Sequence, residues 1–369
     1  MKQLFLAIAV LMSTIIGAGI FSLPYAGAQS GFLIATALLV LLTIIMIALH
    51  LFYGEIILRT KEEYQLPGYI GKYMGENAKK IIGFFAIVGF YGSLLVYILI
   101  GGDFLYIIFS SIFNFPQIVF YLIFFVIGSI AIYFGLKLVS GWDLIMNLVL
   151  VLTIFALFAI SANQIKIDNF KSINWSNIII PYGAIAYALV GIAAIPEVKR
   201  VLGFNSGKGL RKAIIIGTLI PAVIYFVFMG TIIGLTGKNT SPEAIDGLIN
   251  AIGKDIVVTG SLIGFLIVVS SFFSLGLALK ATYMYDFKVK KNTAWALTCL
   301  IPIILVLLGT HNFITIIVFL GALIGATEGI AIVLMYYKVV KPGKAVKILG
   351  YFIILTLFIG FVYTIIKII

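Results

Sequence analysis

The sequence predicts an all-α polytopic membrane protein, built as a 5+5 inverted repeat with breaks in spans one and six and one additional span at its end. Three observations carry this prediction. Hydrophobic residues make up 63% of the 369 residues and charged residues only 10%, far outside the range of soluble globular proteins. Apolar runs of membrane-spanning length recur along the whole chain. Two of these runs are interrupted by glycine and proline at matching spacing.

Windows of roughly 20 apolar residues, the length that one crossing needs, divide the chain into successive spans. Eleven are expected, at 4–28, 31–58, 80–111, 116–135, 139–161, 178–198, 210–235, 255–285, 293–310, 313–338 and 346–368. The first window follows Lys2 closely, but no small-residue cleavage site appears after it, so it is interpreted as a span and not as a signal peptide.

The distribution of basic residues predicts the orientation. With the amino terminus in the cytoplasm, 20 of the 25 Lys and Arg residues fall in cytoplasmic loops and 5 fall outside, as the positive-inside rule requires. We therefore expect a multi-pass protein of a prokaryotic plasma membrane, with a cytoplasmic amino terminus and an external carboxyl terminus.

The same bias accounts for the net charge of +12. Anionic lipid headgroups are the expected partners of the basic loops, so no nucleic acid partner is predicted. The lone Cys299 excludes an internal disulfide and a CxxC metal or redox site. No metal and no cofactor is expected beyond a coupling ion, Na⁺ or H⁺, and the sequence leaves the oligomeric state open.

The first span is broken near its middle by Gly17, Gly19 and Pro24. An interruption inside the bilayer is tolerated only where protein or a water-filled cavity satisfies the freed backbone groups. Two half-helices that meet there leave carbonyls free at the end of the first half and amides free at the start of the second. The break therefore predicts a site for a zwitterion and a cation.

The sixth span repeats this arrangement. Gly191 and Ile192 precede Pro196 by the same spacing that Gly19 and Ile20 precede Pro24. Because the two stretches lie five spans apart, the second copy enters the membrane from the opposite side. The prediction is an inverted repeat, with 1–161 and 178–338 as its two halves and 346–368 outside it.

Three motifs resemble a known transporter family. Residues 16–26 (IGAGIFSLPYA) look like the first-helix signature of the amino acid/auxin permease and aromatic amino acid permease branches of the amino acid–polyamine–organocation superfamily. Residues 186–197 (AYALVGIAAIPE) are similar to their sixth helix, and 270–277 (SSFFSLGL) resemble their eighth. The resemblance implies a LeuT-like fold and ion-coupled amino acid import by alternating access of spans 1, 2, 6 and 7 against a scaffold.

The resemblance also implies a substrate site. The substrate carboxylate is expected at the amides after the first break, and helix N-termini favour anions independently of the family. The ammonium group is expected at carbonyls of the second break, with apolar flanks that suit a neutral or aromatic side chain. The residues implied are Gly17, Ala18, Gly19, Ile20, Ala186, Ala188, Val190, Gly191, Ile192 and Tyr97.

Two modes of ion coupling are predicted. In the family pattern a sodium ion binds between carbonyls of span one and hydroxyls of span eight, here the carbonyls of Ser13 and Ile16 and the side chains of Ser270 and Ser271. Proton coupling needs an ionisable group inside the membrane. Glu328 is the carboxylate placed deepest in a span, so it is the candidate for the proton.

Other functions are weighed against a symporter. An enzyme is disfavoured because HExxH and Gly-x-Ser-x-Gly motifs are absent. A channel is less favoured because channel filters usually rely on oligomeric symmetry, whereas here two inverted breaks lie in one chain. An amino acid exchanger, or a receptor that keeps the transporter fold, stays open.

Overall fold

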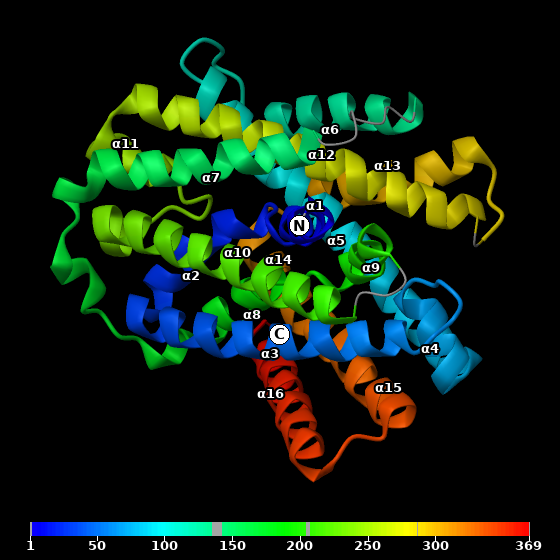
Figure 1. Cartoon of the computed structure of the whole chain (residues 1–369). Helices are drawn as coiled ribbons and strands as arrows, with labels where there is room; N and C mark the ends of the chain where they lie inside the picture. Colours follow the sequence, from blue (N-terminus) through cyan, green and yellow to red (C-terminus); the bar gives the residue numbers. More distant parts are fainter. Residues whose placement is uncertain (1, 135–141, 204–206, 286, 369) are drawn as a thin grey trace.

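The computed structural model describes residues 2–134, 142–203, 207–285 and 287–368, and every regular element in these ranges is a helix (Figure 1). The ends of two predicted spans, at 135 and 139–141, lie outside the described residues. The longer helices are α1 (Lys2–Ile15), α2 (Gly19–Ser30), α3 (Phe32–Leu58), α4 (Leu66–Met74), α5 (Glu76–Phe109), α6 (Gln117–Phe134), α7 (Trp142–Ser161), α8 (Ile179–Ala188), α9 (Ile195–Leu202), α10 (Gly207–Thr236), α12 (Lys254–Tyr285), α13 (Lys291–Leu307), α14 (Phe313–Ile324), α15 (Ile330–Val340) and α16 (Lys344–Ile368).

Short elements join some of these helices. The segment between α7 and α8 contains η1 (Ala162–Gln164), η2 (Ile167–Phe170) and η3 (Trp175–Asn177), and η4 (Ile192–Ala194) leads into α9. Between α10 and α12 lie η5 (Gly237–Asn239), η6 (Asp246–Leu248) and α11 (Ile249–Ile252). The π-helical η7 (Gly325–Gly329) connects α14 to α15.

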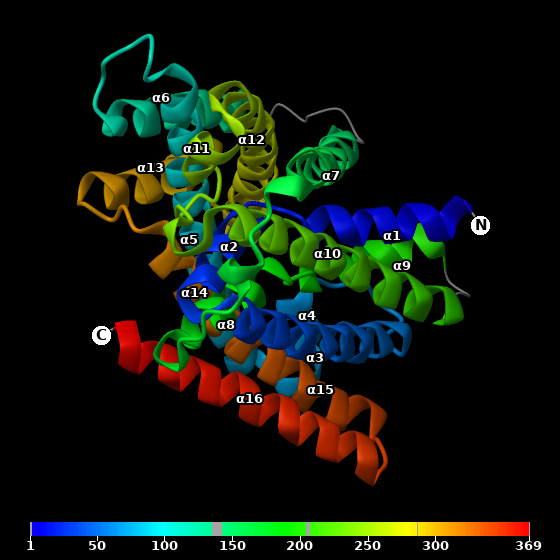
Figure 2. The same ribbon diagram turned by 90° about the vertical axis from the view of Figure 1, so that its left-hand side faces the viewer.

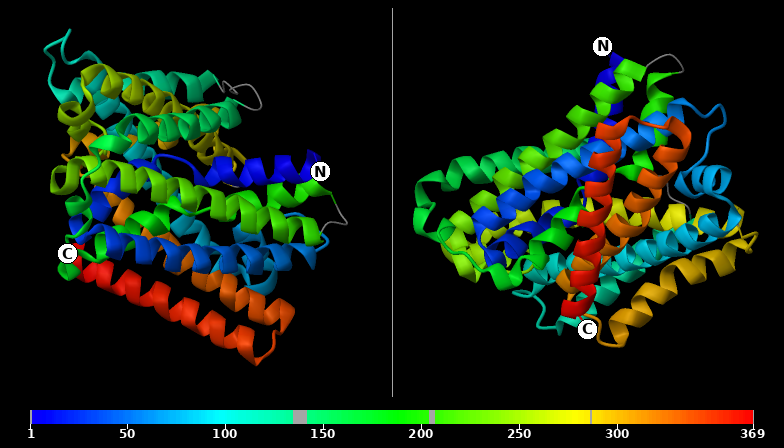
Figure 3. Two further views of the ribbon diagram at one scale, coloured as in Figure 1. Left: turned by 60° about the vertical axis from the view of Figure 1, so that its left-hand side comes forward. Right: turned by 90° about the horizontal axis from the view of Figure 1, so that it is seen from below.

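The described residues contain nine helices that are long and apolar enough to cross a membrane, and the bent pair α1–α2 makes a tenth span. The protein is therefore a multi-pass integral membrane protein. The amino and carboxyl termini lie at opposite ends of the helix bundle (Figures 2 and 3). The apolar α13, with 17 residues, is the segment that would make eleven. That number stays a prediction, as do the repeat boundaries and the orientation.

The interrupted helices occupy the middle of the bundle. Helix α10 packs against α1, α2, α3 and α9, while α8 packs against α2, α3 and α14, and Figure 2 shows α1 lying between α7 and α10. Most of α2 is buried along its length. The broken helix is therefore surrounded by protein, which is the condition under which an interruption inside a membrane is tolerated.

Glycines allow the closest helix contact in this core. A Cβ atom on Gly321 of α14 would lie 2.0 Å from the carbonyl oxygen of Gly183 of α8, so only glycine fits there. Small residues at such contacts let two helix backbones approach and gain dispersion energy without a hydrophobic driving force. This contact fixes the first half of span six against span ten.

Apolar side chains cover the outside of the bundle. Exposed examples come from several helices, among them Phe5, Ile44, Leu152 and Phe358. In water such a surface would be a large exposed apolar patch, whereas a bilayer core accepts it. The outer surface therefore matches the membrane location.

Candidate functional site

The first break lies between α1 and α2, which are bent by 58° relative to each other. Ile16, Gly17 and Ala18 connect them and belong to neither helix. Among the described residues, the amides of Gly17 and Ala18 donate to no backbone carbonyl, and Gly19 opens α2, where the first amides lack a carbonyl one turn earlier. These three amides form the positive end of a helix dipole.

At Ile20 the structure differs from the sequence prediction. The sequence predicts a free amide at this position, but the Ile20 amide donates to the Gly17 carbonyl at 3.3 Å, and the Phe21 amide donates to Ala18 at 3.2 Å. These tight i to i−3 bonds close the first turn of α2. The amides of Gly17, Ala18 and Gly19 are therefore the candidates for binding an anion, and the Ile20 amide stabilises their turn.

The second break lies between α8 and α9. Helix α8 ends at Ala188, and Leu189 and Val190 donate back to Ile185 and Tyr187 at 3.0 and 3.3 Å. Gly191 then leads into η4, whose Ala194 amide donates to the Gly191 carbonyl at 3.1 Å. The carbonyl of Ala188 stands at the negative end of the α8 dipole.

The two breaks meet in space. A Cβ atom on Gly19 would lie 2.9 Å from the Cα atom of Ala188, and one on Gly191 would lie 2.8 Å from the Ile15 side chain. The absence of a side chain at Gly19 thus brings the N-terminus of α2 against the C-terminus of α8. Amide donors and a carbonyl acceptor come together at one place.

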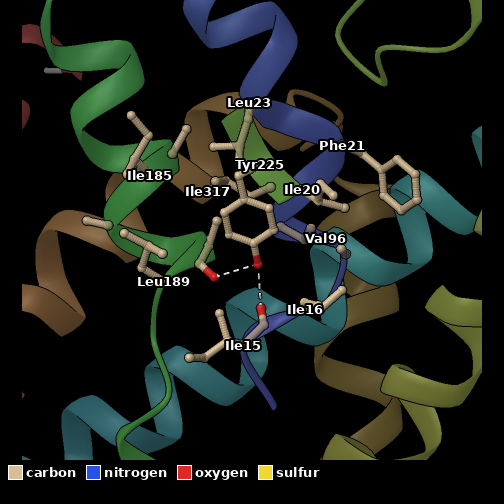
Figure 4. Close-up of a cluster of buried hydrophobic side chains, with 14 of the residues drawn as sticks. Ile15, Ile16, Ile20, Phe21, Leu23, Val96, Ile185, Leu189, Tyr225 and Ile317 are labelled. Carbon is tan, nitrogen blue, oxygen red and sulfur yellow. Dashed lines mark hydrogen bonds between the residues drawn. The ribbon is translucent and has the colours of Figure 1, made fainter. Parts of the chain in front are cut away.

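The hydroxyl group of Tyr225 in α10 contacts a backbone carbonyl at each of the two breaks. Its hydroxyl group lies 2.8 Å from the carbonyl oxygen of Ile15, at the end of α1, and 3.0 Å from that of Ala188, at the end of α8 (Figure 4). The ring is fully buried. Three helices therefore converge on one phenol group.

Hydroxyl groups line the other side of the first break. The Tyr97 side chain of α5 lies near those of Tyr187 of α8 and Ser271 of α12, and the Tyr187 hydroxyl donates to Ser93 at 2.9 Å. A Cβ atom on Gly17 would lie 3.9 Å from the Tyr97 hydroxyl. Tyr97 therefore stands next to the turn to which the sequence assigns the substrate carboxylate.

The flanks of this junction are apolar. Ala186 and Ile192 are buried, as are Ile20 and Phe21, and Figure 4 shows Ile20, Ile185, Leu189 and Ile317 around the Tyr225 ring. Phe21 packs edge-on against Phe104 with ring centroids 5.0 Å apart. The surroundings suit an uncharged substrate side chain.

The residues of the predicted cation site lie on two elements. The carbonyls of Ser13 and Ile16 lie at the end of α1 and in the connection to α2, and the Ser13 hydroxyl accepts a hydrogen bond from the Asn147 amide of α7 at 3.1 Å. Ser270 and Ser271 lie on α12, where Ser270 is buried and Ser271 lies near Tyr97.

Glu328 lies apart from this junction, in η7. This segment packs against α5, α14, α15 and α16, and a Cβ atom on the adjacent Gly329 would contact Leu357 of α16 and Leu49 of α3. Among the described residues Glu328 forms no ion pair or hydrogen bond.

Sequence reasoning missed three partners at the site: Tyr225, Tyr187 and Asn147. Each is a hydrogen-bonding side chain in an otherwise apolar span, which is a usable signal. Their acceptors lie far away in sequence, however; Tyr225 and Ile15 are 210 positions apart. Tyr91, on the same helix as Tyr97, is bonded elsewhere, to Tyr283 at 2.5 Å and to the Leu297 carbonyl at 3.2 Å.

Solved structures share this fold. MhsT in complex with L-phenylalanine superposes with a TM-score of 0.65 at 16% identity, covering 98% of this chain and 96% of that one. The inward-facing conformation of Mhp1 gives a TM-score of 0.68 at 14% identity, covering 89% of this chain and 76% of that one. Another Mhp1 structure is described as a nucleobase-cation-symport-1 family transporter. The fold is thus the LeuT-like transporter fold.

Sequence relatives give the family. Glutamine transporter 2 of Aliivibrio fischeri is 19% identical over 335 residues, covering 87% of this chain and 85% of the relative. Tyrosine-specific transport system 1 of Haemophilus influenzae is 24% identical over 279 residues, covering 72% of this chain and 69% of the relative. The model of the tryptophan/tyrosine permease family matches residues 1–368. The chain therefore belongs to the tryptophan/tyrosine permease family and is a membrane transporter, not an enzyme.

Proposed function

We propose that the protein is an ion-coupled symporter that imports neutral amino acids, with aromatic side chains favoured, by alternating access. The contact between Gly19 and Ala188 carries this proposal. An α-amino acid bears its carboxylate and its ammonium group on one carbon, so its site needs donors and acceptors side by side. The α2 N-terminus and the α8 C-terminus supply them there, with dipoles of the matching sign.

The surrounding residues support an uncharged side chain. None of the residues predicted to line the site is acidic or basic, and Tyr97 and Tyr187 add aromatic surface. Aromatic rings pack favourably edge-on or offset against a substrate ring. The names of the family and of the tyrosine-specific relative, and the L-phenylalanine bound to MhsT, point in the same direction.

Alternating access follows from the two breaks. The elements α1, α2, α3, α8, α9 and α10 contact one another around Tyr225. A break lets each half of a span tilt while the other half keeps its contacts. We propose that these elements move as a unit against α5, α6, α12 and α13, and that the site opens to one side at a time.

For the coupling ion we favour the proton, carried by Glu328. Glu328 lies in η7, inside the helical segment from α14 to α15, and has no cationic partner among the described residues. Carboxylates inside membrane spans commonly serve proton relays. The competing arrangement is sodium coupling, with the ion bound by the carbonyls of Ser13 and Ile16 and the hydroxyls of Ser270 and Ser271. Experiment must distinguish it from proton coupling through Glu328.

The deciding experiment is uptake of labelled L-tryptophan, L-tyrosine, L-phenylalanine and L-glutamine into proteoliposomes, with proton and sodium gradients imposed separately. Saturable accumulation of the aromatic substrates under a proton gradient is expected. Accumulation under sodium alone would overturn the proton assignment. Exchange without accumulation under either gradient would overturn the symporter in favour of an exchanger.

A further inference from the structure

The Tyr225 hydroxyl occupies the one place where the ends of two broken helices face each other. It lies 2.8 Å from the Ile15 carbonyl oxygen and 3.0 Å from the Ala188 carbonyl oxygen (Figure 4). The last carbonyls of a helix carry partial negative charge. Two such ends held close together repel unless a donor lies between them, and the phenol provides that donor.

A phenol has one hydrogen to donate, and each carbonyl oxygen has two lone pairs. Tyr225 therefore leaves acceptor capacity on both carbonyls. Ala188 is also the residue whose Cα and Cβ atoms lie against Gly19, the first residue of α2. A substrate ammonium group brings three donors and a full charge, and hydrogen bonds from a charged donor are the stronger ones.

The position of the hydroxyl is fixed by packing. The Tyr225 ring is fully buried, and Figure 4 shows it enclosed by Ile16, Ile20, Leu23 and Val96. A group that is held in place keeps the carbonyl it binds in place too. Orientation of this kind is how residues that do not touch the substrate contribute to binding.

We propose that Tyr225 is a positioning residue for the ammonium group of the substrate: it holds the Ala188 carbonyl towards that group and ties α8 to α1. This inference rests on the proposed function. It predicts that removing the phenol oxygen weakens recognition of the ammonium group specifically, and not the pocket as a whole.

The test compares Tyr225→Phe with wild-type protein in equilibrium binding of L-tryptophan and in competition by indole-3-propionate, which lacks the amino group. Tyr225→Phe is expected to bind L-tryptophan about tenfold more weakly, the scale of one hydrogen bond to a charged group. Competition by indole-3-propionate should be unchanged. The matched control is Tyr182→Phe in α8, because the buried Tyr182 hydroxyl has no hydrogen-bond partner among the described residues, and it should bind like wild type.

Two results overturn the inference: unchanged L-tryptophan affinity in Tyr225→Phe, or an equal loss for both ligands, which would indicate general distortion of the pocket. Tyr225→4-aminophenylalanine keeps N–H donors and should restore the preference for L-tryptophan. This variant also tests the proposal if Tyr225→Phe does not fold. A folded 4-aminophenylalanine protein that does not prefer L-tryptophan to indole-3-propionate would refute the proposal. If wild-type protein binds no aromatic amino acid, the proposed substrate class fails instead.

Discussion

Gly19 and Ala188 belong to different broken helices, and a Cβ atom on Gly19 would lie 2.9 Å from the Cα atom of Ala188 and 3.2 Å from the Tyr187 ring. Backbone atoms at that distance cannot yield as a flexible side chain can. The contact sets how closely the amides of α2 approach the carbonyl end of α8. The fit of an α-amino acid between them depends on it.

Gly19→Ala should therefore separate the two breaks and raise the Kd for the preferred amino acid by about tenfold or more, with a β-branched residue worse still. Gly17→Ala is the matched comparison, because its new Cβ would meet only the Tyr97 hydroxyl, at 3.9 Å. It should raise the Kd less than Gly19→Ala does. Isothermal titration in detergent measures both. Equal effects at the two positions would contradict the importance of the Gly19 contact.

Ser271→Ala tests the sodium arrangement. If sodium binds at Ser270 and Ser271, losing one hydroxyl should raise the sodium concentration needed for half-maximal uptake severalfold, because oxygen ligands set the affinity for hard cations. Ser274→Ala on the exposed face of α12 is the control. An unchanged sodium response in both variants removes Ser271 from the cation site.

Much of the fold could be predicted from the sequence, because an apolar run of about 20 residues has few alternatives to a membrane helix. The breaks at Gly17–Gly19 and Gly191 were equally visible, since glycine and proline stand out in such runs. The structure puts non-helical backbone at Ile16–Ala18 and Leu189–Gly191, where those residues lie.

The partners across the site could not be predicted. Asn147 reaches Ser13 across 134 positions and Tyr225 reaches Ile15 across 210, and periodicity contains no information on such pairs. The bonded amide of Ile20 was missed for another reason: the turn after the break tightens into i to i−3 bonds, a local detail that residue types do not specify.

Lys280 of α12 should matter for stability more than for transport. It is buried, and its Nζ donates to the carbonyls of Ile132 and Tyr133 at 2.7 and 3.0 Å, at the C-terminal end of α6, where a cation is favourable. Lys280→Met should lower the free energy of unfolding by on the order of 1–3 kcal/mol, measured by denaturant unfolding in detergent. Lys288→Met, at an exposed position, should change little, and equal stabilities would show that the Lys280 contacts contribute nothing.

Glu328→Gln tests the proton assignment through its pH dependence. If uptake requires a protonated Glu328, wild-type uptake should rise as the external pH falls. It should decline at higher external pH, because fewer transporters then have a protonated Glu328. Glutamine resembles the protonated carboxyl group but cannot release a proton. The variant should therefore exchange amino acid across the membrane at a rate independent of pH, while losing accumulation driven by a proton gradient.

Uptake and counterflow in proteoliposomes over a range of pH measure the two activities separately. Asp168→Asn, a change at an exposed carboxylate paired with Lys171 at 2.7 Å, is the control and should keep the wild-type profile. A Glu328→Gln protein that still accumulates substrate with wild-type pH dependence would show that the proton is carried elsewhere.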